Sequence, residues 1–157
     1  MTDKEYMELA LKEADKASEY GDIPVGALVV KDGVILGRGR NEREKNCDPA
    51  AHAEIQALRA AALETGSWNL EGATLYSTVE PCPMCAGALI NSRIMRLVYG
   101  ADEPNFGSAG SQINLLQFPG FNHSVRIVGG VLAEESTALL KEFFVKLRQC
   151  NKEDKEL

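Results

Sequence analysis

The stretch from Thr74 to Tyr99 constrains the fold of this chain more than any other part of the sequence. It contains two β-rich apolar segments, 74–79 and 94–99, separated by a short helix expected over 83–90. A strand, a helix and a second strand in this order predict a right-handed crossover, which makes the two strands parallel neighbours in one sheet. The fold must therefore include a parallel pair with a helix packed across it.

The other segments extend this pattern to a complete α/β domain. The sequence predicts an opening helix that ends near Gly21, strands at 25–30, 34–37 and 125–128, a helix that starts at Asp48-Pro49, and a closing helix with an apolar stripe. We expect a three-layer α/β sandwich, with one mixed sheet of about five strands and helices on both faces. With 157 residues the chain fits one domain, placed at 1–150, followed by a polar tail at 151–157.

The charge balance limits the partners of the chain. Its net charge is −6, which argues against a surface that binds nucleic acids nonspecifically. Any RNA partner would need a local basic patch or recognition of exposed bases. No apolar run approaches the roughly 20 residues that span a bilayer, and the charged N-terminus lacks a secretory signal. We therefore expect a cytoplasmic chain with no membrane partner.

Two short segments carry the residues suited to chemistry: His52-Ala53-Glu54 and Pro81-Cys82-Pro83-Met84-Cys85. Cys82 and Cys85 lie three apart at a helix start, where thiol pKa values fall and both sulfurs can face the same way. Together with His52 they give three protein ligands, the number that leaves a catalytic zinc ion one position for water. We predict one Zn²⁺ per chain at these residues.

Glu54 is the candidate proton carrier of this site. Two thiolates already neutralise the charge of Zn²⁺, so the ion should acidify water less than it would with three histidines. A general base nearby becomes more necessary, and Glu54 can take a proton from water and return it to the substrate. On an ideal helix Glu54 points about 200° away from His52, which fits a residue that does not ligate the metal.

Two plainer interpretations stay open from the residues alone. The C-x-x-C pair is also typical of thioredoxin-like redox sites. A closed structural site would form if Cys47 joined His52, Cys82 and Cys85 as a fourth ligand. However, H-x-E followed by P-C-x-x-C is the signature of zinc deaminases that act on nucleobases, and it favours a catalytic site.

The chain resembles the bacterial tRNA-specific adenosine deaminases over nearly its whole length. The match includes 24–27, 48–55, 74–76, 80–82, 84–88, 92–94, 99–101, 107–111, 122–123, 130–135 and 143–144. The catalytic half is shared by all cytidine-deaminase-like enzymes, and the C-terminal half favours the tRNA branch. The resemblance implies hydrolytic conversion of adenosine to inosine at the wobble position of a tRNA anticodon.

The resemblance also implies partners and substrate contacts. It implies a homodimer, with the anticodon loop bound across both subunits and the target base turned into the zinc pocket. Asn41 matches a position that contacts the target nucleoside, and the backbone N–H of Ala53 would help to position the base. From the residues alone, Asn41 reads as a turn residue after a strand.

Some positions depart from the family pattern. Pro83 also occurs in guanine deaminases, and Asn105 and Ser124 stand where cations are frequent in relatives. The remaining candidates for phosphate contacts are Arg38, Arg40, Arg43, Lys45, Lys146 and Arg148. A deaminase of free guanine, cytosine or a related nucleoside is therefore the alternative enzyme, and a structural zinc module or a non-catalytic RNA-binding protein is the alternative outside enzymes.

Overall fold

Five strands form one mixed sheet in the computed structural model, which describes residues 1–156. The elements in chain order are α1 (Asp3–Ser18), β1 (Gly26–Lys31), β2 (Val34–Arg40), α2 (Arg43–Asn46), α3 (Ala53–Thr65), β3 (Thr74–Val79), α4 (Pro83–Asn91), β4 (Arg96–Ala101), β5 (Arg126–Val128) and α5 (Ala133–Glu156). The strand order is β2-β1-β3-β4-β5, with β1 antiparallel to both neighbours and β3, β4 and β5 parallel. The predicted parallel pair around α4 is confirmed.

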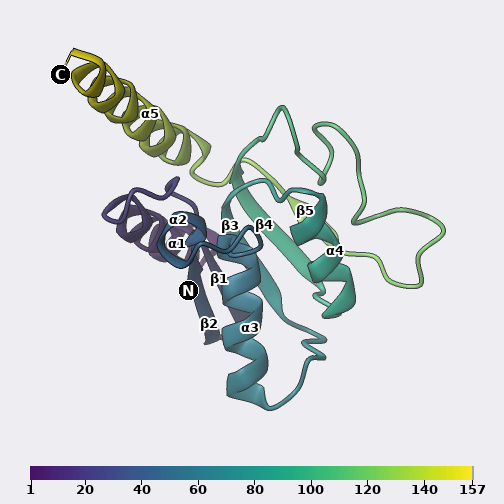
Figure 1. Cartoon of the computed structure of the whole chain (residues 1–157). Coiled ribbons are helices and arrows are strands. Elements are labelled where there is room, and N and C mark those ends of the chain that lie inside the picture. The colour runs from purple at the N-terminus through teal and green to yellow at the C-terminus, as the bar shows by residue number, and fades with distance from the viewer. Residues whose placement is uncertain (157) are drawn as a thin grey trace.

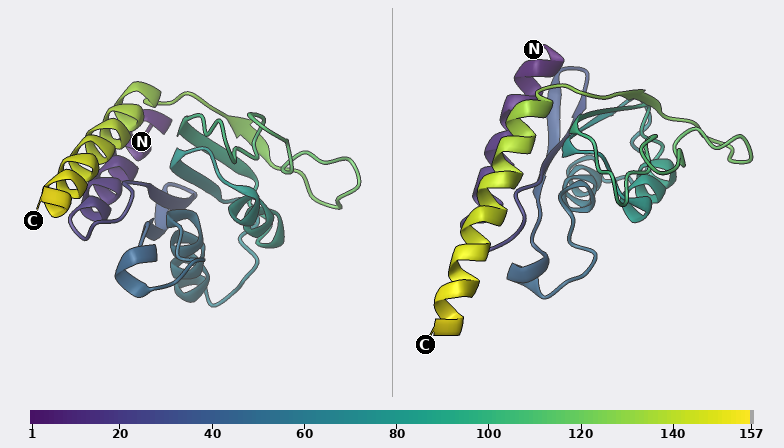
Figure 2. Two further views of the ribbon diagram at one scale, coloured as in Figure 1. Left: turned by 45° about the horizontal axis from the view of Figure 1, so that its top comes forward. Right: turned by 90° about the horizontal axis from the view of Figure 1, so that it is seen from above.

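Helices cover both faces of the sheet, as the sequence predicts (Figure 1). On one face, α3 and α4 pack against the inward side chains of β1, β3 and β4 and form the larger core. On the other face, α1 closes a smaller core with Leu28, Tyr76 and Val98. The two further views show α5 running alongside α1 on that second face (Figure 2). The expected three-layer α/β sandwich is confirmed.

Two glycines of β2 bring α3 close to the sheet. A Cβ at Gly39 would lie 2.2 Å from the carbonyl oxygen of Ala53 and 2.4 Å from the nitrogen of Ala57. A Cβ at Gly37 would lie 2.3 Å from the carbonyl oxygen of Ala57. Neither position has room for a side chain, because the backbone of α3 packs directly against β2. This close packing sets the position of the first turn of α3.

The predicted start of this helix is wrong by several residues. The chain forms an additional short helix, α2, and α3 begins only at Ala53. The Asp48 side chain accepts a hydrogen bond from the backbone nitrogen of Ala50 at 2.9 Å, a local turn that competes with helix formation. His52 is therefore the extended N-cap residue, with φ −69° and ψ 154°, and does not lie within the helix.

The closing helix is longer than the sequence suggests. α5 continues to Glu156, so residues 151–156 of the expected tail are helical and exposed, and Leu157 lies outside the described residues. Phe144 and Leu147 of the predicted apolar stripe remain exposed. The division into a domain and a tail stays a prediction. Over residues 1–156, none of the helices is both long enough and apolar enough to cross a membrane.

Candidate active site

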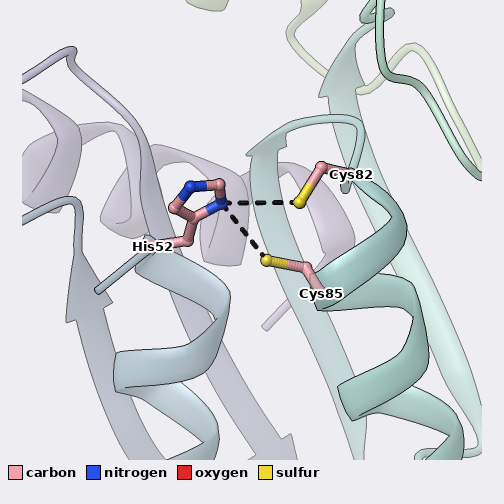
Figure 3. Close-up of side chains that lie close together, drawn as sticks. All are labelled: His52, Cys82 and Cys85. Atoms are coloured by element: carbon pink, nitrogen blue, oxygen red, sulfur yellow. Dashed lines mark hydrogen bonds between the residues drawn. The ribbon is translucent and has the colours of Figure 1, made fainter. Parts of the chain in front are cut away.

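Two helix N-termini bring the three predicted metal ligands together. His52 caps α3, Cys82 caps α4, and Cys85 lies in the first turn of α4. The sulfurs of Cys82 and Cys85 each lie 3.5 Å from Nδ1 of His52, and all three side chains point into the space between the two helices (Figure 3). Their donor atoms lie within 4.8 Å of one another, so a single small cation can contact all three.

The donor atoms of these side chains suit a metal that binds sulfur and nitrogen. Hydrogen bonds from Cys85 and His52, offset in part by burial, lower the pKa of Cys82 to about 4. The contact with Cys82 also raises the pKa of His52. The contact with Cys82 and burial raise the pKa of the Cys85 thiol. Two sulfurs and one imidazole nitrogen are the donor set that Zn²⁺ prefers, and the residues present fit that ion.

Cys47 does not join this group. It is exposed, has a left-handed backbone conformation with φ 50°, and its sulfur faces the carbonyl oxygen of Glu44 at 3.9 Å. Within residues 1–156, the cluster of metal-binding side chains consists of one histidine and two cysteines. Cys47 therefore does not supply a fourth protein ligand to this cluster.

Glu54 lies directly beside the ligand cluster. It is only 4% exposed, and its Oε2 accepts from the Cys85 thiol at 3.5 Å. The Ser77 hydroxyl on β3 lies 3.1 Å from Oε1 of Glu54. Burial raises the pKa of Glu54. Because His52 is extended, the expected angular separation along a helix does not keep the two side chains apart.

A cavity of about 640 Å³ opens onto these residues. Its lining comprises Ile23, Val25, Asn41, Arg43, His52, Ala53, Glu54, Val79, Glu80, Cys82, Pro83, Met84, Glu103, Asn105 and Phe106. Both predicted substrate-binding residues, Asn41 and Ala53, lie in this wall. The Asn41 amide donates to the carbonyl oxygen of Ile23 at 3.2 Å, and its oxygen accepts from the nitrogen of Arg43 at 3.3 Å.

Glu80 organises one side of the cavity, a role that sequence reasoning missed. The side chain is 2% exposed, and it accepts hydrogen bonds from the backbone nitrogens of Glu103, Ala109 and Ser111 at 3.0–3.1 Å. The Ser111 hydroxyl donates to it as well. Burial opposes ionisation, but these donors prevail and lower the pKa of Glu80. The signal available in the sequence was the position of Glu80 directly before Pro81-Cys82.

An open α/β sheet that presents a histidine, two cysteines and a buried glutamate at two helix N-termini defines a nucleobase-deaminase type of hydrolase. The sequence model of the MafB19-like deaminase family matches residues 1–148. The chain is 48% identical to a tRNA-specific adenosine deaminase of Bacillus subtilis over 96% of this chain and 93% of the relative. It is 46% identical to that of Haemophilus influenzae over 99% of this chain and 90% of the relative.

A solved structure agrees with the sequence comparison. It comes from work on A-to-I editing by tRNA:A34 deaminases at the wobble position of transfer RNA, and is 40% identical with a TM-score of 0.83. The alignment covers 87% of this chain and 99% of that one. The chain therefore belongs to the MafB19-like deaminase family and, within it, to the tRNA-specific adenosine deaminases.

Proposed function

We propose that the chain hydrolyses adenosine to inosine at the wobble position of a tRNA anticodon, with release of ammonia, in the cytoplasm. The observation that carries the proposal is the placement of His52, Cys82 and Cys85 around a buried Glu54 at the wall of a cavity of about 640 Å³. The membership of the chain in the tRNA-specific adenosine deaminases supports the substrate.

In this proposal His52, Cys82 and Cys85 hold one zinc ion per chain. Zinc at such a site supplies water of lowered pKa as the nucleophile. Glu54 takes a first proton from the attacking water and delivers it to the purine ring nitrogen. It then takes the second proton, from the hydroxyl added at the ring carbon, and delivers it to the departing amine, so that ammonia leaves and the carbonyl of inosine forms. Its buried carboxyl, with a raised pKa, suits both halves of this transfer.

The remaining residues of the cavity orient the base. The N–H of Ala53 is the first of α3 and belongs to the donors that a helix leaves without an intrahelical partner. We propose that it donates to the substrate. Asn41 is buried beside it, and its amide is held by Ile23 and the nitrogen of Arg43. The expected contact between Asn41 and the nucleoside therefore relies on a preorganised side chain.

Three of the predicted phosphate contacts, Arg38, Arg40 and Lys45, are already engaged within the protein. Arg38 and Arg40 both lie within 4.0 Å of the Glu13 carboxylate, and Lys45 lies over the Tyr20 ring at 4.4 Å. Arg43, in contrast, is exposed in the cavity wall. We propose that Arg43 makes the main contact with the phosphate backbone of the RNA near the target nucleotide.

The deciding experiment compares substrates. Purified protein is incubated with an anticodon stem-loop that carries adenosine at the wobble position and, separately, with free adenosine, cytidine, guanine and cytosine. We expect inosine and ammonia from the stem-loop and little turnover of the free compounds. Ready turnover of free guanine or cytosine with an untouched stem-loop would show that the chain is a free-base deaminase.

We also propose that the active form is a homodimer. Leu63, in the last turn of α3, and Trp68, in the loop that follows this helix, are 85% and 66% exposed. They border shallow hollows beside α3 and α4 that are lined in part by Leu58, Ala62 and Ala88. Contiguous apolar surface of this kind is typical of protein interfaces, which supports a second copy on this face.

A further inference from the structure

Phe106 is a large apolar side chain left in solvent at the rim of the active-site cavity. It is 66% exposed, yet it belongs to the cavity wall together with Met84 and Asn105. Met84, in the first turn of α4, is also partly exposed. An aromatic ring in this position does not stabilise the hydrophobic core, since the fold does not bury its surface. It lines the same cavity as His52 and Cys82.

The loop that carries Phe106 is held firmly on both sides of the ring. Glu80 accepts hydrogen bonds from the backbone nitrogens of Glu103, Ala109 and Ser111. The nitrogen of Gly107, the next residue, donates to the carbonyl oxygen of Glu103 at 2.9 Å. A Cβ at Gly107 would lie 2.5 Å from the Glu80 carboxylate, so the loop packs directly on this anchor. The ring therefore projects from a preorganised support.

The charges around the cavity separate two kinds of contact. Glu103 lies in the wall beside Phe106 and repels phosphate from this side. Arg43 is exposed in the same cavity wall and attracts phosphate. A single RNA strand that enters the cavity is therefore expected to place its phosphate backbone near Arg43. One of its unstacked bases then lies toward Phe106. Single-stranded RNA is recognised largely by stacking such bases on aromatic side chains.

We infer that Phe106 forms a stacking subsite for the nucleobase next to the target adenosine. The subsite rests on the proposed function, because it requires a single-stranded RNA whose target base occupies the zinc pocket. Stacking compensates for weak electrostatic attraction in a chain with a net charge of −6. Stacking also favours an RNA loop over a free nucleoside as the substrate, since a free nucleoside carries no second base.

The test uses Phe106→Leu, which keeps apolar bulk without a π-face, and Phe106→Tyr, which keeps the ring. Stem-loops carry 5-iodouridine on the 5′ or the 3′ side of the wobble adenosine, and photocrosslinks are mapped by mass spectrometry. We expect a crosslink at residue 106 from one flanking position in the parent and in Phe106→Tyr, and none at residue 106 in Phe106→Leu. Phe118→Ala, which removes an exposed ring outside this cavity wall, should keep the crosslink.

Binding and turnover give the second measurement. Phe106→Leu and Phe106→Ala should weaken the Kd for the unlabelled stem-loop about 5- to 100-fold, raise KM and leave zinc content unchanged, while Phe106→Tyr stays near the parent. If the parent deaminates the stem-loop and Phe106→Leu does so with the same Kd and KM, the subsite is wrong and the proposed function stands. A parent that neither binds nor deaminates the stem-loop would overturn both.

Discussion

At the scale of single residues, the site depends on a carboxylate held out of water beside a cluster of metal-binding side chains. Glu54 lies against the Cys85 thiol on one side and the Ser77 hydroxyl on the other. Ser77 has one hydroxyl proton and two nearby acceptors, since the carbonyl oxygen of Val79 is 2.7 Å away. Glu54 is thus fixed in position by contacts that tolerate either protonation state.

Replacing Glu54 should separate proton transfer from metal binding. We expect Glu54→Ala, and the isosteric Glu54→Gln, to lower kcat by roughly 10²–10⁴-fold. The zinc content and the melting temperature should stay near those of the parent, because neither variant removes a ligand. Turnover is measured on the stem-loop and zinc by elemental analysis. Retention of most of the turnover would place the proton route at another residue.

The cysteines provide a paired test of the metal centre. Cys82→Ala should abolish stoichiometric zinc binding, because two protein ligands remain of the three that converge. Cys47→Ala should keep about one zinc per chain and full activity, because Cys47 is exposed and turned toward Glu44. Loss of metal from Cys47→Ala would indicate a closed structural site and contradict the catalytic proposal.

At the scale of elements, a polar contact ties α1 to the sheet. Asp3, in the first turn of α1, accepts hydrogen bonds from Tyr76 on β3 at 2.8 Å and from Arg96 on β4 at 3.0 Å. The bond from Arg96 lowers the pKa of Asp3, although burial acts in the opposite direction. The ionised carboxylate also lies at the positive end of the helix dipole. One side chain thus joins three elements.

This contact predicts a pH-dependent part of the stability. Because the folded pKa of Asp3 lies below its unfolded value of about 3.9, the stabilisation is fully present above that value. It is lost as the pH falls through the lower folded pKa. Asp3→Asn should therefore lower the free energy of unfolding by about 1 kcal/mol at neutral pH. In thermal melts, the difference from the parent should shrink below about pH 4.

A matched control is available on the same helix. Asp15 is an exposed carboxylate of α1, and Asp15→Asn should give melting curves close to those of the parent at each pH. A difference between Asp3→Asn and the parent that stays constant from pH 7 to pH 3 would mean that the effect arises from packing and not from ionisation of Asp3.

The elements themselves were largely predictable, because periodicity and turn residues are local signals. The sequence predicts β3 with its exact bounds and α4 to within one residue, and the C-x-x-C spacing at a helix start identifies Cys82 and Cys85. The start of α3 was not predictable in the same way. Asp48-Pro49 resembles a helix start, but the Asp48 side chain makes a local turn with Ala50.

The rest of the site depends on contacts between distant segments. Glu80 acts through backbone donors more than twenty residues further along the chain, and no spacing rule indicates such a partnership. Phe106 could have been core or surface by its sequence alone, and its exposure follows only from how the loop folds. Local sequence patterns indicate the fold class, whereas contacts between distant segments determine the shape of the cavity.

At the scale of the whole molecule, the apolar surface around Leu63 and Trp68 predicts the assembly. We expect light scattering to give about 34 kDa, twice the 17.1 kDa of one chain. The double substitution Leu63→Ser and Trp68→Ser should shift the protein to a monomer with unchanged circular dichroism. Val34→Ser, at an exposed apolar position of the β1–β2 hairpin, should leave the dimer intact. A parent that is monomeric at micromolar concentration would contradict the homodimer.

The order of the elements along the chain also has a consequence for biosynthesis. The three side chains around the metal-binding space, and the strands β1, β2 and β3 that support them, all precede Arg96, where β4 begins. The loop that carries Phe106, the last two strands and α5 are translated afterwards. Since chains emerge from the ribosome N-terminus first, the donor set for the metal is complete before the loop that carries Phe106 has been synthesised. A nascent chain therefore contains every side chain of the metal-binding cluster before the last part of the cavity wall exists.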